Sequence, residues 1–246
     1  MNGLTEFADG GFSFLHGVFP YSQGVVACPG FAIERARFAR PVAMSEGFRR
    51  ISGHLASLGR PLTALCACEL RSPKPFSFAG FGEFNKGYVA VLEHWGLYRN
   101  GLNPVARSNV APEIDPPAES AFYAFSYTVP LADAPSSFVV AGSGEWPEGR
   151  RFPEDVVARG DASAAGLQAK ARWVLDMMEN RLRGLGGFGW RDATAVQVYT
   201  VIQFPVAEVT RRTGSSLMWH YCRPPIEGLE FEMDVRGVRS EIVLQG

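Results

Sequence analysis

Apolar residues recur at helical spacing in two long stretches of the chain. The first set is Met44, Phe48, Ile51, Leu55 and Leu58, with Ser45 near its start and Gly59 at its end. The second set is Leu167, Ala171, Val174, Met178, Leu182 and Leu185, followed by Gly186 and Gly187. Intervals of three and four place such residues on one face of a helix, and serine and glycine are common at helix starts and ends. We therefore predict helices at about 45–58 and 165–185.

Other segments alternate between apolar and polar residues, which is the pattern of a β-strand. The clearest are residues 62–70, 122–129, 193–202 and 229–236. In the last of these, the apolar side chains are expected to face inward. The polar side chains of Glu230, Glu232, Asp234 and Arg236 are expected to face outward. Two shorter stretches, near 84–95 and 206–214, predict a second helix in each half.

The order of these predicted elements occurs twice along the chain. Each half reads helix, strand, helix, strand, and each opens with a predicted hairpin, near 23–38 and near 138–145. Pro112, Pro116 and Pro117 interrupt regular structure between the halves. We predict an α+β protein of two tandem units, at 12–118 and 119–246. Each is expected to be a mixed β-sheet with helices packed on one face.

Composition narrows the classes of function. The 246 residues carry a net charge of −1 and no basic patch, which argues against nucleic acid as a partner. No apolar run is long enough to span a membrane, and residues 1–11 do not resemble a signal peptide, so a cytoplasmic location is expected. The four cysteines and four histidines show no C-x-x-C or H-x-x-x-H spacing. The sequence therefore predicts neither a metal nor another cofactor.

Three strings in the first half carry a family resemblance. They are Pro20-Tyr21-Ser22-Gln23, Phe81-x-x-Phe84-Asn85-x-x-Tyr88 and Ala106-Arg107-Ser108. The second half adds residues 139–144 and an acidic closing strand at 229–232. Together they resemble the RidA (YjgF-like) family of imine and enamine deaminases, whose units have a chorismate-mutase-like fold. Members of that family assemble as trimers with sites between subunits. The resemblance thus implies a homo-oligomer, with a trimer favoured over a monomer.

The resemblance also implies a site around Arg107. Arg107 is expected in the loop after the second predicted helix. A guanidinium offers a planar fork of donors that fits a carboxylate, so Arg107 is expected to anchor a small acidic substrate. Tyr21 would line the pocket or orient a water molecule, and Glu232 or Glu230 would hold water in the second half. Further substrate-binding residues are expected from their place in the matching strings: Ser108, Tyr88, Gly142 and Ser143.

Three more residues complete the expected site and its surroundings. Glu113 is a candidate acid–base group in the loop that follows Arg107. Arg223 stands in the altered arginine turn of the second half, before Pro224 and Pro225, and is a candidate second anchor. Asn85 is expected to be a surface or capping group of the second helix.

These expectations favour a metal-independent deaminase that hydrolyses an imine or enamine of a small carboxylic or dicarboxylic acid and releases ammonia. The 2-aminomuconates of aromatic-ring degradation are a suitable class, because they are conjugated diacids with an enamine nitrogen. Two alternatives remain open at this point. One is a chorismate-type hydrolase or lyase built on the same tandem fold. The other is a non-catalytic protein that binds a carboxylate metabolite.

Overall fold

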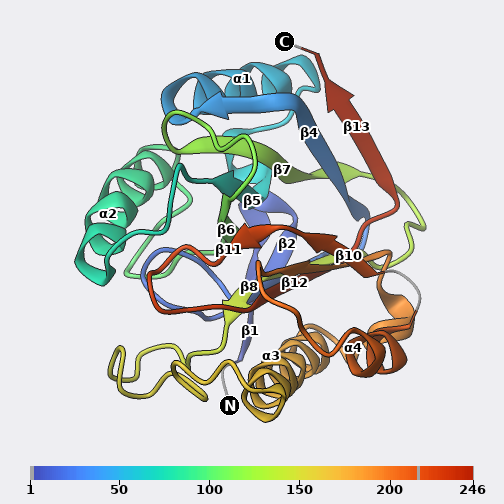
Figure 1. Cartoon of the computed structure of the whole chain (residues 1–246). Coiled ribbons are helices and arrows are strands. Elements are labelled where there is room, and N and C mark those ends of the chain that lie inside the picture. The colour runs from blue at the N-terminus through green and yellow to red at the C-terminus, as the bar shows by residue number, and fades with distance from the viewer. Residues whose placement is uncertain (1–2, 215–216, 246) are drawn as a thin grey trace.

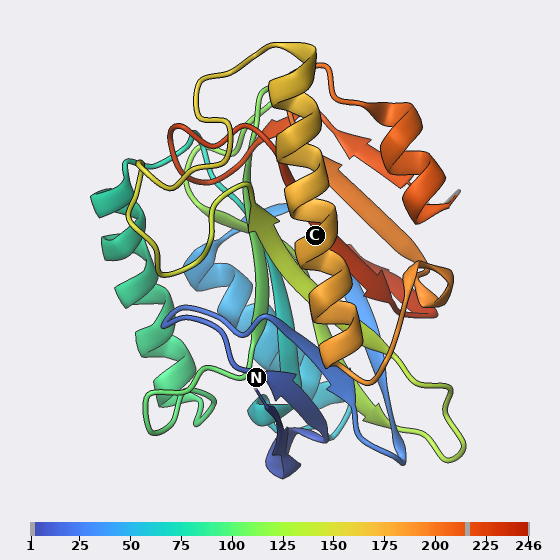
Figure 2. The same cartoon turned by 90° about the horizontal axis from the view of Figure 1, so that it is seen from below.

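Two β-sheets lie face to face in this chain, and a pair of helices covers the outer face of each (Figures 1 and 2). The structure is a computed structural model that describes residues 3–214 and 217–245. The predicted second unit therefore includes three positions, 215, 216 and 246, that lie outside the described residues. The apolar core has three main parts, one under each helical layer and one between the sheets.

The helices agree with the apolar stripes of the sequence. They are α1 (Met44–Ser57), α2 (Phe78–His94), α3 (Ala164–Gly184) and α4 (Val206–Thr213). At the start of α2 and α3, the side chains of Ser77 and Ser163 each accept a backbone N–H hydrogen bond at 3.1 Å. Such caps satisfy a donor that the first turn of a helix leaves free. Among the described helices, none combines the length and the hydropathy needed to cross a bilayer.

Each sheet is mixed, as the sequence predicts. The first has the strand order β1 (Leu4–Phe7), β2 (Phe12–Leu15), β3 (Gly24–Ala27), β8 (Phe138–Gly144), β12 (Glu232–Gly237), β9 (Ala195–Tyr199) and β10 (Leu217–His220). The second has the order β11 (Cys222–Arg223), β6 (Ala106–Pro112), β5 (Leu65–Arg71), β7 (Ala121–Pro130), β4 (Phe31–Ala43) and β13 (Ser240–Leu244). The parallel pairs are β9 with β10, β5 with β6 and β4 with β13.

Both halves of the chain contribute strands to each sheet. β1, β2 and β3 join the sheet of β8, β9, β10 and β12, while β11 and β13 join the sheet of β4 to β7. The predicted hairpins are wrong. β3 pairs with β2 and β8, whereas β4 pairs with β7 and β13, so the turn between β3 and β4 links two sheets. The segment predicted as the second hairpin is a single strand, β8.

The polar face of β12 is buried, which corrects the expectation that it points outward. Glu232, Asp234 and Arg236 are all buried, because the second sheet covers this face. Buried charges need partners. Asp234 accepts hydrogen bonds from Ser108 Oγ at 2.6 Å, Gln197 Nε2 at 2.7 Å and Tyr199 Oη at 2.9 Å. Alternation of polar residues therefore marks a polar layer between two sheets in this chain, and not a solvated surface.

Candidate active site

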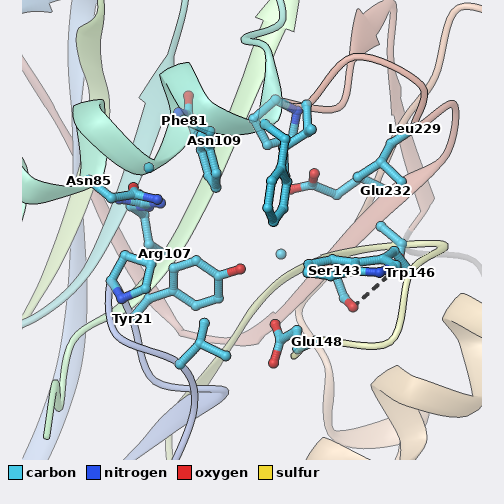
Figure 3. A pocket seen from close by; sticks show the side chains of 18 of the residues that line it. Tyr21, Phe81, Asn85, Arg107, Asn109, Ser143, Trp146, Glu148, Leu229 and Glu232 are labelled. Atoms are coloured by element: carbon cyan, nitrogen blue, oxygen red, sulfur yellow. Dashed lines mark hydrogen bonds between the residues drawn. The ribbon is translucent and has the colours of Figure 1, made fainter. Parts of the chain in front are cut away.

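A cavity of about 290 Å³ opens at the seam between the two sheets (Figure 3). Its walls come from α2, the middle of β6, the segment before β3, the end of β8 with the loop after it, and residues 225–232. Five of the residues predicted for the site line this cavity together: Tyr21, Arg107, Gly142, Ser143 and Glu232. The sequence strings that resemble one family thus converge on one place.

Arg107 lies on a strand, where the sequence analysis expects a loop. β6 runs parallel to β5, with Arg107 opposite Cys68, and the arginine is only 2% exposed. Alternation along β6 turns Arg107 and Asn109 to the cavity, while Ser108 points to Asp234 in the facing sheet. The backbone N–H of Ser22 donates to Val105 O at 2.9 Å, which fixes the neighbouring Tyr21 beside β6.

The guanidinium of Arg107 is held on one side only. Its Nη2 donates to Asn85 Oδ1 at 2.7 Å, and its Cζ lies 5.0 Å from the ring centre of Tyr21 and 4.8 Å from that of Tyr88. Its buried Nη1 has no hydrogen-bond partner within the part of the chain that the structure describes. Burial lowers the pKa of Arg107, while the neighbouring Tyr88 acts in the opposite direction. Asn85 is buried and orients this arginine, which corrects its expected place on the helix surface.

Asn109 supplies a second donor of the same kind. Its Oδ1 accepts a hydrogen bond from Ser72 Oγ at 3.0 Å, which leaves the buried Nδ2 without a partner. Asn109 lines the cavity two positions along β6 from Arg107. Leaving a buried donor unsatisfied costs roughly 1–3 kcal/mol. A cationic and a neutral donor at one end of a cavity make a binding site for a carboxylate.

Glu232 enters the cavity from the facing sheet. A Cβ on Gly142 would lie 2.3 Å from Glu232 Oε1, so a larger residue at 142 would displace this carboxyl group from its position. Burial raises the pKa of Glu232 well above its usual range, Asp234 and Glu145 raise it further, and Arg107 partly offsets them. A raised pKa favours the protonated carboxyl group, which is the form that can donate a proton.

Two more polar groups border the same space (Figure 3). Burial raises the pKa of Tyr21, and the nearby Glu148 adds to that effect, so the phenol stays neutral. The carboxylate of Glu148 accepts from Arg181 Nη2 at 2.9 Å and from Gln23 Nε2 at 3.4 Å. Tyr21, Glu148 and Glu232 approach the cavity from different elements, and no pattern in the sequence singles out Glu148 or Arg181.

Three apolar side chains complete the lining of the cavity. Phe81 comes from α2, Trp146 from the loop after β8, and Leu229 from the segment before β12. The sequence contains the α2 stripe, but the residues of the two loops have no periodicity that would identify them. A flat apolar wall beside a carboxylate anchor suits an unsaturated acid.

Four of the predicted site residues lie outside the cavity lining. Arg223 Nε pairs with Glu113 Oε1 at 2.5 Å, and both side chains are on the surface. The pair lies at the end of β6, because β11 aligns Arg223 with Ala111 and Cys222 with Pro112. Ser108 and Tyr88 support the site from behind, through Asp234 and the Arg107 guanidinium respectively.

Within residues 3–214 and 217–245, no group of three or more His, Cys, Asp or Glu side chains is arranged to hold a metal ion.

Comparisons with known proteins give a consistent relationship along the whole chain. A family model described as 2-aminomuconate deaminase CnbZ matches residues 4–242. The 2-amino-5-chloromuconate deaminase of Comamonas testosteroni is 47% identical over 252 residues, which covers 99% of this chain and 100% of that protein.

Two solved structures are similar in fold. A chorismatase has a TM-score of 0.51 at 12% identity, over 94% of this chain and 78% of its own. A cyanuric acid hydrolase has a TM-score of 0.46 at 12% identity, over 87% of this chain and 69% of its own. At such low identity, the chorismatase indicates a related fold and nothing about the reaction.

Proposed function

Because this chain belongs to the 2-aminomuconate deaminase family CnbZ, we propose that it hydrolyses an aminomuconate, or a similar enamine of a small dicarboxylic acid, and releases ammonia. One observation identifies the residues that would perform this reaction. Arg107 Nη1 and Asn109 Nδ2 are buried donors without hydrogen-bond partners among the described residues, and they belong to residues of a cavity that also contains Glu232, whose pKa burial raises. This arrangement provides an anchor for a carboxylate and a proton for the adjoining enamine.

The first step is binding of the substrate carboxylate next to the carbon–nitrogen bond. Arg107 and Asn109 donate to its two oxygens, and the conjugated chain lies against Phe81 and Trp146. Such binding fixes the enamine carbons relative to Glu232. Holding reacting groups in one orientation removes much of the entropic cost of the reaction.

The second step is protonation of carbon. Glu232 gives its proton to the enamine carbon, the nitrogen lone pair forms the C=N bond, and an iminium ion results. A carboxyl group whose pKa is raised toward the working pH is suited to this role. Water then adds to the iminium carbon, and the resulting carbinolamine loses ammonia to leave an oxo acid. This scheme uses neither a metal ion nor a covalent intermediate with the protein.

We also propose that the two halves are RidA-type units in tandem, with the division near 118, and that the enzyme is a cytoplasmic homo-oligomer, with a trimer favoured. The strings around Tyr21 and Arg107 and the paired sheets support the first part. Exposed apolar side chains on the sheet edges support the second: Met218 and Trp219 on β10, and Ile242 and Val243 on β13. Exposed edge strands readily pair with another chain.

The test is the release of ammonia from freshly prepared 2-aminomuconate. The proposal expects one ammonia and one oxo acid for each substrate molecule, at a rate well above that in buffer. Formation of pyruvate from chorismate, without ammonia release from the enamine, would favour a chorismate hydrolase or lyase. Binding of the acid without turnover would favour a metabolite-binding protein.

A further inference from the structure

We propose that Glu148 is a second catalytic carboxylate, which takes the proton from the attacking water, and that Arg181 positions it. This inference rests on the proposed deamination and assigns the step that Glu232 does not perform. It follows from the contacts of Glu148 and from the contrast between the two glutamates of the cavity.

The carboxylate of Glu148 is fixed although it stands in a loop. Arg181 reaches it from α3 with Nη2 at 2.9 Å from Oε1, and Gln23 Nε2 lies 3.4 Å from Oε2. The exposed fractions of the Arg181 and Glu148 side chains are 1% and 13%. Withdrawing such a pair from water is costly, so a loop glutamate gains little stability from this position. A functional role accounts for the position.

Arg181 also donates hydrogen bonds to the end of β8, which lies beside Glu232. Its Nη1 donates to the carbonyl oxygens of Ala141 at 3.0 Å and Gly142 at 3.3 Å. Gly142 is the residue whose missing side chain leaves room for Glu232. The buried guanidinium of Arg181 therefore holds both Glu148 and the end of β8, where Gly142 contacts Glu232.

The two glutamates have different surroundings. Glu148 forms an ion pair with the buried Arg181, whereas Glu232 forms no ion pair among the described residues and burial raises its pKa. Two carboxyl groups in one cavity with such different surroundings commonly divide the acid and base roles. Tyr21, a neutral phenol beside Glu148, is placed to donate to the same water (Figure 3).

The complete cycle balances with these two groups. Glu232 protonates the enamine carbon. The water oxygen then bonds to the iminium carbon as Glu148 takes one water proton. Glu148 returns that proton to the nitrogen, the C–N bond breaks, and ammonia leaves. The remaining hydroxyl proton passes to Glu232 as the carbonyl forms, which restores both glutamates.

The experiment compares Glu148→Gln with the wild type in D₂O, on freshly prepared 2-aminomuconate. Glutamine keeps the shape of the side chain and can still accept from Arg181, so folding should be preserved. Ammonia release should fall at least ~100-fold in kcat with KM changed less than about threefold, because a general base is lost. Deuterium should still enter the substrate carbon, because Glu232 is intact.

Two further variants sharpen the assignment. Glu148→Ala should regain activity when formate is added, since a small carboxylate can occupy the space. Arg181→Met should lower kcat with little change in KM, because Glu148 is no longer held in place, and Arg181→Lys should restore part of kcat. A purely structural role would instead lower the urea midpoint in parallel with kcat. The matched control is Glu208→Gln, since Glu208 pairs with Arg172 on the surface of α4 and should be dispensable.

Other results would overturn the inference. If Glu148→Gln keeps more than a tenth of kcat, Glu148 is not the base. If this variant loses both deuterium incorporation and ammonia release, Glu148 acts in the earlier protonation step instead. Failure of the wild type to release ammonia from any aminomuconate would instead refute the proposed function, so the two failures are distinguishable.

Discussion

Replacing Arg107 by methionine tests the carboxylate anchor with little disturbance of the fold. The guanidinium is 2% exposed, is packed among aromatic rings and donates one hydrogen bond to Asn85. Methionine fills most of that space, whereas alanine would leave a cavity between the rings. Because burial lowers the pKa of Arg107, its charge is costly to the folded protein. We therefore expect the free energy of unfolding of Arg107→Met to be unchanged or slightly increased.

The loss of activity can be estimated from the hydrogen bond that Arg107 is proposed to donate to the substrate. Its Nη1 has no hydrogen-bond partner among the described residues, and a hydrogen bond to a charged group contributes about 1.5–3 kcal/mol. At 1.36 kcal/mol for each factor of ten, kcat/KM should fall about 10-fold to 150-fold. Arg107→Lys should recover only part of this loss, because one ammonium cannot reproduce the fork that holds both Asn85 and the substrate.

The assay is ammonia release from 2-aminomuconate at several substrate concentrations, with the urea midpoint of each variant measured in parallel. Arg172→Met is the matched control, since Arg172 is an exposed arginine of α3 that pairs with Glu208. Full kcat/KM in Arg107→Met would refute the anchor. If Arg223→Met abolished activity at the same time, the functional site would lie at the surface pair of Arg223 and Glu113 instead.

Three further predictions follow from the same geometry. Glu232→Gln should lower kcat by roughly 10²- to 10⁴-fold, as expected for loss of a general acid. Gly142→Ala should also lower kcat, because the added Cβ displaces Glu232. A normal kcat in either variant would contradict the role of Glu232. Burial raises the pKa of Glu145 from 4.5 to about 7, so the folded state binds this proton more tightly than the unfolded chain, and the wild type should lose stability as pH rises from about 4.5 to about 7. Glu145→Gln should lack this loss of stability. The urea midpoint of Glu145→Gln minus that of the wild type should therefore be larger at pH 8 than at pH 5. The same difference at both pH values would contradict the prediction. Light scattering at micromolar concentration should give about three times the 26.9 kDa mass of one chain, whereas a mass of one chain would count against the trimer.

Much of the fold could be predicted because the helices are amphipathic. Apolar residues at spacings of three and four locate α1 and α3 to within a residue or two at their ends, since each helix buries one stripe against a sheet. Strand pairing could not be predicted in the same way. The turn after β3 has the length of a hairpin, but β3 and β4 join different sheets, and only contacts between distant segments determine that choice.

The site could be predicted in part, for a similar reason. Arg107 and Tyr21 belong to recognisable strings, and Asn109 could have been found by alternation once residues 106–112 were taken as a strand. The polar residues of β12 were expected at the surface, because alternation alone does not reveal that a second sheet covers them. Glu148 and Arg181 meet from a loop and a helix 33 residues apart, and their pairing depends on the packing of α3 against β8.

The most direct test of the central claim is a crystal structure with the oxo acid product of aminomuconate hydrolysis bound. The account predicts that the carboxylate next to the carbonyl carbon accepts hydrogen bonds from Arg107 Nη1 and Asn109 Nδ2, with the carbonyl carbon between Glu232 and Glu148. A product molecule bound away from Arg107, or bound there with the reacting carbon turned away from both glutamates, would contradict it.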